Sequence, residues 1–200
     1  MPEDVAFDEQ LPLSLQLKAG THFTPVAVAR LVAQLLAPEP GLNVLDVGSG
    51  AGKFCITAAR AVPDARFVGV EWRPHLVRLA TRLAEGVPNV RFIHADALDL
   101  DWSSFDAFYF YNPFAEHLFD GVFGLDHTIS LDPLDFAVYV GAVTDRLARA
   151  RVGTRVVTYH GLGAALPAGY VLVRATAIAS DTVELWIKES ETGMANTASP

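Results

Sequence analysis

The sequence has one cysteine among its 200 residues, and it has fewer basic than acidic residues, 15 against 23. A single cysteine excludes an internal disulfide framework, and the apolar neighbours of Cys55 indicate a packed side chain. The net charge of -8 argues against a protein that holds nucleic acid through a broad basic surface. We therefore expect a small-molecule or protein substrate, and we do not expect nucleic acid as a partner.

Long hydrophobic runs are also missing. Arg30 and Gln34 interrupt the first apolar stretch, and Pro167 and Arg174 interrupt the last, so none reaches membrane-spanning length. The first nine residues are acidic and lack the basic start and apolar centre of a signal peptide. We expect a cytoplasmic protein without a membrane partner, and its oligomeric state stays open. A hydrophobic content of 51% suffices for one sizeable core.

Three glycines at alternate positions follow a run that is typical of a buried strand. The strand-like residues 43–47 lead into Gly48, Gly50 and Gly52, and a helix-forming segment comes next. A turn without Cβ atoms lets a ligand approach the backbone closely, and the helix N-terminus offers amide groups to it. A second strand-like run ends on Glu71, about twenty residues later, where an acid meets ribose hydroxyls in nucleotide-binding folds. The pattern predicts a nucleotide site, and a ligand-free strand-to-helix turn is the alternative.

The spacing of these glycines differs from the dinucleotide fingerprint G-x-G-x-x-G. Asp46, two residues before the first glycine, suits a cation and would repel a pyrophosphate. Together with Glu71, the segment resembles motif I of class I S-adenosylmethionine (SAM) dependent methyltransferases. The resemblance implies SAM as the cofactor, with its methionine half on the turn and its α-ammonium near Asp46. The turn residues that it assigns to the cofactor are Gly48, Ser49, Gly50 and Gly52.

Strand-like and helix-like segments alternate along most of the chain, which predicts an α/β fold with a parallel sheet and helices on both faces. Two β-rich runs then form a terminal antiparallel hairpin. This order resembles the seven-stranded, doubly wound, mostly parallel sheet of the family, with strand order 3-2-1-4-5-7-6. The expected helices are 25–36, 52–62, 74–85 and 133–150, and the expected strands are 43–47, 66–70, 90–94, 106–111, 154–159, 170–178 and 182–188.

We expect three regions along the chain. Residues 1–40 form an N-terminal extension and lid helix, residues 41–189 form the SAM-binding methyltransferase domain, and the small, polar residues 190–200 form a disordered tail. Thr24 and Pro25 are typical of an N-cap and a first helical residue. The segment that contains them resembles one that closes over the methionine end of SAM in some amino methyltransferases, so the resemblance also implies that Thr24 faces the ligand.

Two more segments resemble adenine-binding and acceptor-binding motifs of the family. Asp96 and Ala97 follow the third strand, where the resemblance implies that the acid accepts the adenine amino hydrogen and the next amide points at the ring. Trp72 is expected against the adenine face, with plain helix-start packing as the alternative. Asn112-Pro113-Phe114 is similar to the [D/N/S]-P-P-[Y/F/W] motif, which implies that Asn112 accepts hydrogen bonds from a target amine and Phe114 stacks on it. The second proline is missing, so packing of Phe114 in the core stays open.

The sequence therefore predicts an enzyme, a SAM-dependent methyltransferase that transfers a methyl group to an amino nitrogen of a small molecule or protein. Its residues would align the acceptor with the methyl group and exclude water. We expect no metal site, and we expect the polar cluster Glu116, His117 and Asp120 on a solvated surface. Two alternatives remain: a nicotinamide-linked oxidoreductase, and a non-catalytic SAM-binding module, which the incomplete Asn112 motif allows.

Overall fold

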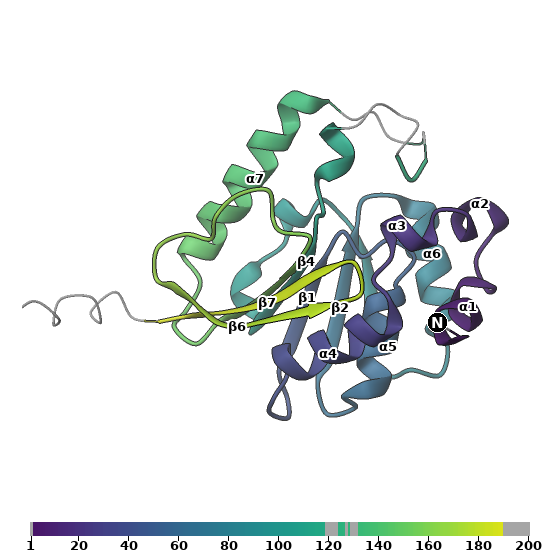
Figure 1. Cartoon of the computed structure of the whole chain (residues 1–200), viewed down its shortest axis with the longest axis horizontal. Helices are drawn as coiled ribbons and strands as arrows, with labels where there is room; N and C mark the ends of the chain where they lie inside the picture. Colours follow the sequence, from purple (N-terminus) through teal and green to yellow (C-terminus); the bar gives the residue numbers. More distant parts are fainter. Residues whose placement is uncertain (1, 119–123, 127, 129–131, 190–200) are drawn as a thin grey trace, which may run out of the picture.

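The computed structural model describes residues 2–118, 124–126, 128 and 132–189. Its centre is a seven-stranded sheet in the order β3-β2-β1-β4-β5-β7-β6 (Figure 1). All strands are parallel except β7, which runs antiparallel to both β5 and β6. This confirms the predicted doubly wound fold with its terminal hairpin. The strands are β1 (Asn43–Val47), β2 (Arg66–Glu71), β3 (Val90–His94), β4 (Ala107–Tyr111), β5 (Arg155–Tyr159), β6 (Tyr170–Ile178) and β7 (Asp181–Lys188).

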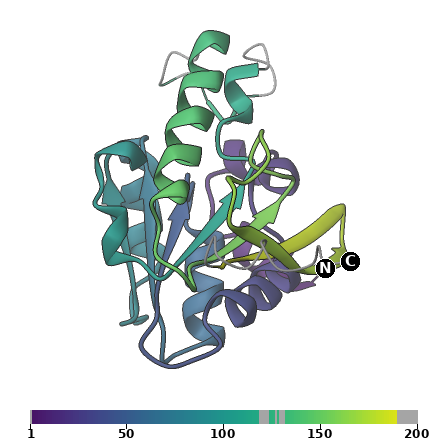
Figure 2. The ribbon, with the colours of Figure 1, turned by 90° about the vertical axis from the view of Figure 1, so that its left-hand side faces the viewer.

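Successive side chains of a strand point to opposite faces of the sheet, and both faces are apolar here. Helices therefore cover both faces. In β1, Val44 packs in one core with α4 (Val26–Leu36) and α5 (Lys53–Ala61). Leu45 and Val47 pack in the opposite core with α7 (Pro133–Ala148). The first turns of α7 rise past the strand ends (Figures 1 and 2). The other helices that follow β1 are α6 (Pro74–Leu83) and the 3₁₀ helices η1 (Ala97–Asp99), η2 (Trp102–Ser104) and η3 (Ala115–Leu118).

Three short helices that the sequence did not predict precede the first long one. They are α1 (Pro2–Asp8), α2 (Leu13–Gln16) and α3 (Ala19–His22), and they share an apolar core with α5 and α6. The buried ammonium of Lys53 on α5 lies 3.0 Å from Asp4 and 2.8 Å from Asp8, both on α1. The acidic start of the chain is therefore docked on the sheet domain, and the division into regions at residue 40 stays a prediction. Within the described residues, every helix is too short or too polar to cross a bilayer.

The prediction that Thr24 caps α4 is wrong. Pro25 occupies the N-cap position, and the Val26 amide donates instead to Oδ1 of Asp4 at 2.8 Å. Thr24 is buried, with its Oγ1 2.9 Å from the hydroxyl oxygen of Tyr109. The cap comes from α1, and such a contact across the chain leaves no local sequence signal.

Candidate functional site

The carboxyl ends of the parallel strands form the edge at which the sheet changes its direction of winding, between β1 and β4. A cavity of about 100 Å³ lies at this edge. The segments that follow β1, β2, β3 and β4 build its walls, and α7 adds one aromatic side chain. Six of the predicted site residues come together there: Gly48, Glu71, Trp72, Asp96, Ala97 and Phe114.

Two backbone amides hold the Glu71 carboxylate in the cavity wall. Its Oε2 accepts from the Gly50 amide at 3.0 Å, and its Oε1 accepts from the Arg73 amide at 2.9 Å. The side chain is 5% exposed. Each carboxylate oxygen has more than one acceptor position, so these bonds fix Glu71 and leave capacity for hydroxyl donors of a ligand.

The amides of the glycine turn are used within the protein, which the sequence did not reveal. Those of Gly48 and Ser49 donate to the Val70 carbonyl at 3.0 and 2.9 Å, and that of Gly52 donates to Ser49 at 2.9 Å. The Gly50 amide is taken by Glu71. Because pyrophosphate binding depends on free amides, this turn disfavours a dinucleotide. Gly48 lines the cavity, and a Cβ atom on it would lie 3.3 Å from the Pro113 side chain.

The other residues of the turn pack inward and do not line the cavity. A Cβ atom on Gly50 would lie 2.9 Å from the ring of Phe23, and one on Gly52 would lie 2.5 Å from the ring of Phe92. The Ser49 side chain lies over Gly69 of β2, and its buried Oγ has no hydrogen-bond partner among the described residues. Close packing explains both glycines, and the assignment of Ser49, Gly50 and Gly52 to the cofactor stays a prediction.

Asp46 lies beneath the turn, on the face of β1 that carries α4 and α5. Its Oδ2 accepts from the Cys55 thiol at 3.3 Å, and no cation of the described part of the chain pairs with it. Burial, together with the nearby charge of Glu71, raises the pKa of Asp46 to about 7. The structure thus holds a buried carboxyl group that lacks a cation. On the same face, the buried Thr24 is engaged by Tyr109 and does not line the cavity.

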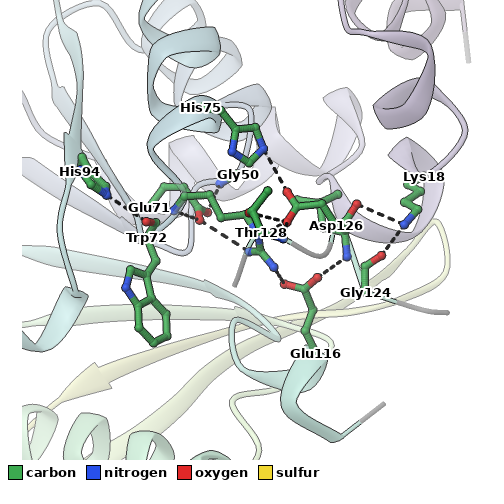
Figure 3. Close-up of polar contacts among 12 residues, drawn as sticks. Lys18, Gly50, Glu71, Trp72, His75, His94, Glu116, Gly124, Asp126 and Thr128 are labelled. Atoms are coloured by element: carbon green, nitrogen blue, oxygen red, sulfur yellow. Dashed lines mark hydrogen bonds and ion pairs between the residues drawn. The ribbon is translucent and has the colours of Figure 1, made fainter. Parts of the chain in front are cut away.

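A buried cation that the sequence did not predict lies beside Glu71. The Arg73 guanidinium is 3.7 Å from Glu71, 2.9 Å from Glu116 and 3.3 Å from Asp126. Burial opposes its charge, but the carboxylates of Glu116, Glu71 and Asp126 outweigh burial and raise the pKa of Arg73. Figure 3 shows these three acids converging, and Lys18 holds the adjoining Gly124 carbonyl.

The expectation that Glu116 and His117 lie on a solvated surface is therefore wrong. Glu116 points inward to Arg73, and His117 is buried, with its Nδ1 3.0 Å from the Asp132 carbonyl oxygen. Asp120 lies outside the described residues. Among the residues that the structure describes, no three His, Cys, Asp or Glu side chains form a group suited to a metal ion.

Aromatic rings and Asp96 form the end of the cavity away from the glycine turn. Tyr139 of α7 donates its hydroxyl to Oδ2 of Asp96 at 3.0 Å. Its ring stacks on Phe114 at 5.3 Å between centroids and lies 5.9 Å from that of Trp72. Burial and the hydrogen bond to Asp96 raise the pKa of Tyr139 to about 12. Sequence reasoning missed this residue, because the apolar pattern of α7 identifies a core helix and no ligand contact.

A strained edge lies beside the cavity, at the ends of β4 and β5. Asn112 and His160 follow paired positions of these strands, and both have positive φ, 44° and 59°. The third non-glycine residue with positive φ in the described chain is Ala179, in the turn between β6 and β7. Next to it, Asp181 holds Nδ1 of His160 at 2.8 Å, while the imidazole stacks on Tyr111. Strained backbone of this kind clusters at functional sites.

Comparison with known proteins finds a methyltransferase domain in part of the chain. Residues 38–126 match a family described as "Methyltransferase domain". An RNA methyltransferase from Salinibacter ruber in complex with S-adenosyl-L-homocysteine has a similar fold, with a TM-score of 0.60 at 24% identity over 84% of this chain and 94% of that one. TrmN from Thermus thermophilus gives 0.63 at 23% identity, over 87% and 52%. Residues 38–126 therefore match a methyltransferase domain, and the fold of the described chain is similar to that of these methyltransferases, one of which was crystallised with S-adenosyl-L-homocysteine, the demethylated form of SAM.

The curated relatives match the chain over only part of its length. The chain is 42% identical over 60 residues to the tRNA (guanine-N(7)-)-methyltransferase of Nitrosococcus oceani, which covers 29% of this chain and 25% of that protein. The matches to other proteins of the same name, from Pediococcus pentosaceus and Geobacillus thermodenitrificans, also span about a quarter of their length, 27% each.

Proposed function

We propose that this protein transfers the methyl group of SAM to a nitrogen atom of its acceptor. The observation that carries the proposal is the position of Glu71 and Asp96 on two walls of one cavity at the carboxyl edge of the sheet. Glu71 is anchored by the Gly50 amide, and Gly48 lines the cavity without a side chain of its own, next to Pro113. Adenosine matches this arrangement, because its ribose hydroxyls suit Glu71 and its amino group suits Asp96.

The remaining part of SAM suits the buried acid beneath the turn. SAM carries an α-ammonium and a sulfonium, and Asp46 is a buried carboxyl group without a cation among the described residues. A bound cation would favour the ionised form of Asp46, which burial alone disfavours. When bound, SAM supplies an activated methyl group, so the protein needs to position the acceptor and exclude water.

Asn112 is the residue that we assign to the acceptor. It leaves β4 in a left-handed conformation, directly after Tyr111 and beside the cavity residues Pro113 and Phe114. An amine must arrive neutral in order to attack, and an amide oxygen accepts its hydrogen bonds without being a strong base. Phe114 is buried against Tyr139. We therefore assign Phe114 to the wall of the adenosine cavity, and its stacking on the acceptor amine is not part of the proposal.

The acceptor that we favour is an amine of a small molecule or a protein, because the chain carries a net charge of -8. RNA is the second candidate. The relative from Nitrosococcus oceani is named for tRNA guanine N7, which is also a nitrogen atom. Its match covers only 29% of this chain and therefore gives little information on the acceptor.

The test has two stages. Calorimetric titrations with SAM and NAD in parallel examine the cofactor, and NAD binding without SAM binding would reject the proposal. Purified protein is then incubated with tritium-labelled SAM and a cell extract that is separated into small-molecule, protein and RNA fractions. Label in the first two supports the favoured acceptor, and label in RNA supports the second candidate.

Matched variants make the labelling specific. Glu71→Ala should lose both SAM binding and transfer, because it removes the carboxylate assigned to the ribose. Asn112→Ala should keep SAM binding and lose transfer. If the wild-type protein binds SAM but labels no fraction, the non-catalytic SAM-binding module is the correct description.

A further inference from the structure

A side chain of α7, Tyr139, lines the end of the cavity at Asp96. The ring centroid of Tyr139 lies 5.3 Å from that of Phe114, 5.9 Å from that of Trp72 and 5.6 Å from that of His117. The space left at this edge is about 100 Å³. Pockets that enclose ligands the size of a nucleoside typically measure about 300–1,000 Å³. The cavity is smaller than this range, so we expect one of its walls to move when adenosine binds.

The hydroxyl group of Tyr139 donates a hydrogen bond to the carboxylate of Asp96. One carboxylate oxygen, Oδ1, accepts from the Leu98 amide at 2.8 Å and fixes the first turn of η1. The other, Oδ2, accepts from Tyr139 at 3.0 Å. A flat aromatic ring with a hydrogen-bond donor at its edge is also what adenine presents. Tyr139 therefore satisfies the same aromatic walls and the same acceptor that the base would use.

We propose that Tyr139 occupies the adenine subsite in the ligand-free protein and must leave it before adenine enters, so that this residue sets the affinity for the cofactor. The inference rests on the proposed function, because it takes Asp96 and the rings around it as the adenine subsite.

The surroundings of Tyr139 allow such a movement. The residue lies in the first half of α7, whose buried side chains begin only at Val140. On the preceding turns, Leu134 is 79% exposed and Val138 is 66% exposed. These turns rise past the strand ends (Figures 1 and 2). Withdrawal of the ring therefore costs one hydrogen bond and its packing against Phe114 at the edge of one core, and the buried residues of α7 from Val140 onward can stay in place.

The test is a calorimetric titration of the full chain with S-adenosylhomocysteine. Tyr139→Phe removes the competing donor and should tighten binding about fivefold, the value of one ordinary hydrogen bond. Tyr139→Ala removes the ring as well and should tighten binding by about tenfold or more, because the adenine subsite is then open before the ligand arrives. Adenosine alone should gain by the same factor as S-adenosylhomocysteine, because the ring competes with the base and not with the amino-acid half.

Val138→Ala is the matched control, since this exposed neighbour on α7 should leave the affinity unchanged. Thermal unfolding shows whether each variant is folded. If the wild-type protein binds and both Tyr139 variants bind equally or more weakly, the ring is a wall of the site and this inference alone is wrong. If neither the wild type nor Tyr139→Ala binds S-adenosylhomocysteine, the proposed function is wrong and the inference falls with it.

Discussion

Asp46→Asn should stabilise the protein and weaken cofactor binding. In the folded chain, burial raises the pKa of Asp46 from 3.8 to about 7. The folded protein therefore keeps a proton that the unfolded chain loses as the pH rises through the lower value. The free energy of unfolding must then decrease with pH until the folded carboxyl group ionises at about pH 7, and the contribution is constant above that.

The size of this penalty follows from the pKa shift. Each unit corresponds to about 1.4 kcal/mol. A shift of about three units therefore sets an upper limit of about 4 kcal/mol for the penalty above neutral pH, because relaxation and water entry reduce it. An amide has nearly the shape of the protonated acid and does not ionise. The free energy of unfolding of Asp46→Asn should therefore equal that of the wild type in acid and exceed it above neutral pH.

The assay is urea unfolding of both proteins across this pH range. The difference in the free energy of unfolding cancels the titration of the histidines, which both proteins share. It should be close to zero at about pH 4 and reach several kcal/mol at about pH 8. Binding of S-adenosylhomocysteine to Asp46→Asn should be at least tenfold weaker, about 1.4 kcal/mol. A difference that is constant across the range, or an amide variant that is less stable at the upper end, would show that Asp46 does not keep its proton in the folded protein.

Other consequences follow from the same contacts. SAM binding should release a proton below about pH 7 and tighten as the pH rises to that value, because the α-ammonium favours ionised Asp46. Calorimetry in buffers of different ionisation enthalpy measures the proton release, and its absence would contradict the prediction. Arg73→Met should cost about 3–5 kcal/mol of stability in urea unfolding, because three carboxylates lose their shared buried cation; a cost below about 1 kcal/mol would show that the cluster is solvated. Gly52→Ala should lower the midpoint of thermal unfolding, because its Cβ would lie 2.5 Å from Phe92 and its φ is +82°. Adding Phe92→Leu to this variant should recover part of the loss, and no recovery would indicate backbone strain alone.

The fold could be predicted from the sequence because its signals are local. Alternating strands and helices, the glycine turn and the terminal hairpin each follow from short patterns, and the doubly wound order follows from them together with the resemblance. Glu71 at the end of β2 and Asp96 after β3 line one cavity, because the carboxyl ends of neighbouring parallel strands meet, and their assignment to the cofactor stays a prediction.

The missed features depend on contacts between distant parts of the chain. The burial of Arg73 requires Glu116 and Asp126, which come more than forty residues later. The cap of α4 comes from Asp4, and the place of Tyr139 depends on how α7 crosses the strand ends. Asp46 shows a different limit. An aspartate suggests a charged partner, but the alternation of side chains along β1 places Asp46 on the face of the sheet opposite to the cavity.

The most direct measurement is a crystal structure of the protein with S-adenosylhomocysteine. We expect adenine at Asp96 in the place of the Tyr139 ring, ribose hydroxyls on Glu71, and the amino-acid end over the glycine turn toward Asp46. A crevice that stays closed in the presence of saturating ligand, or a nucleoside bound away from Glu71, would contradict this expectation.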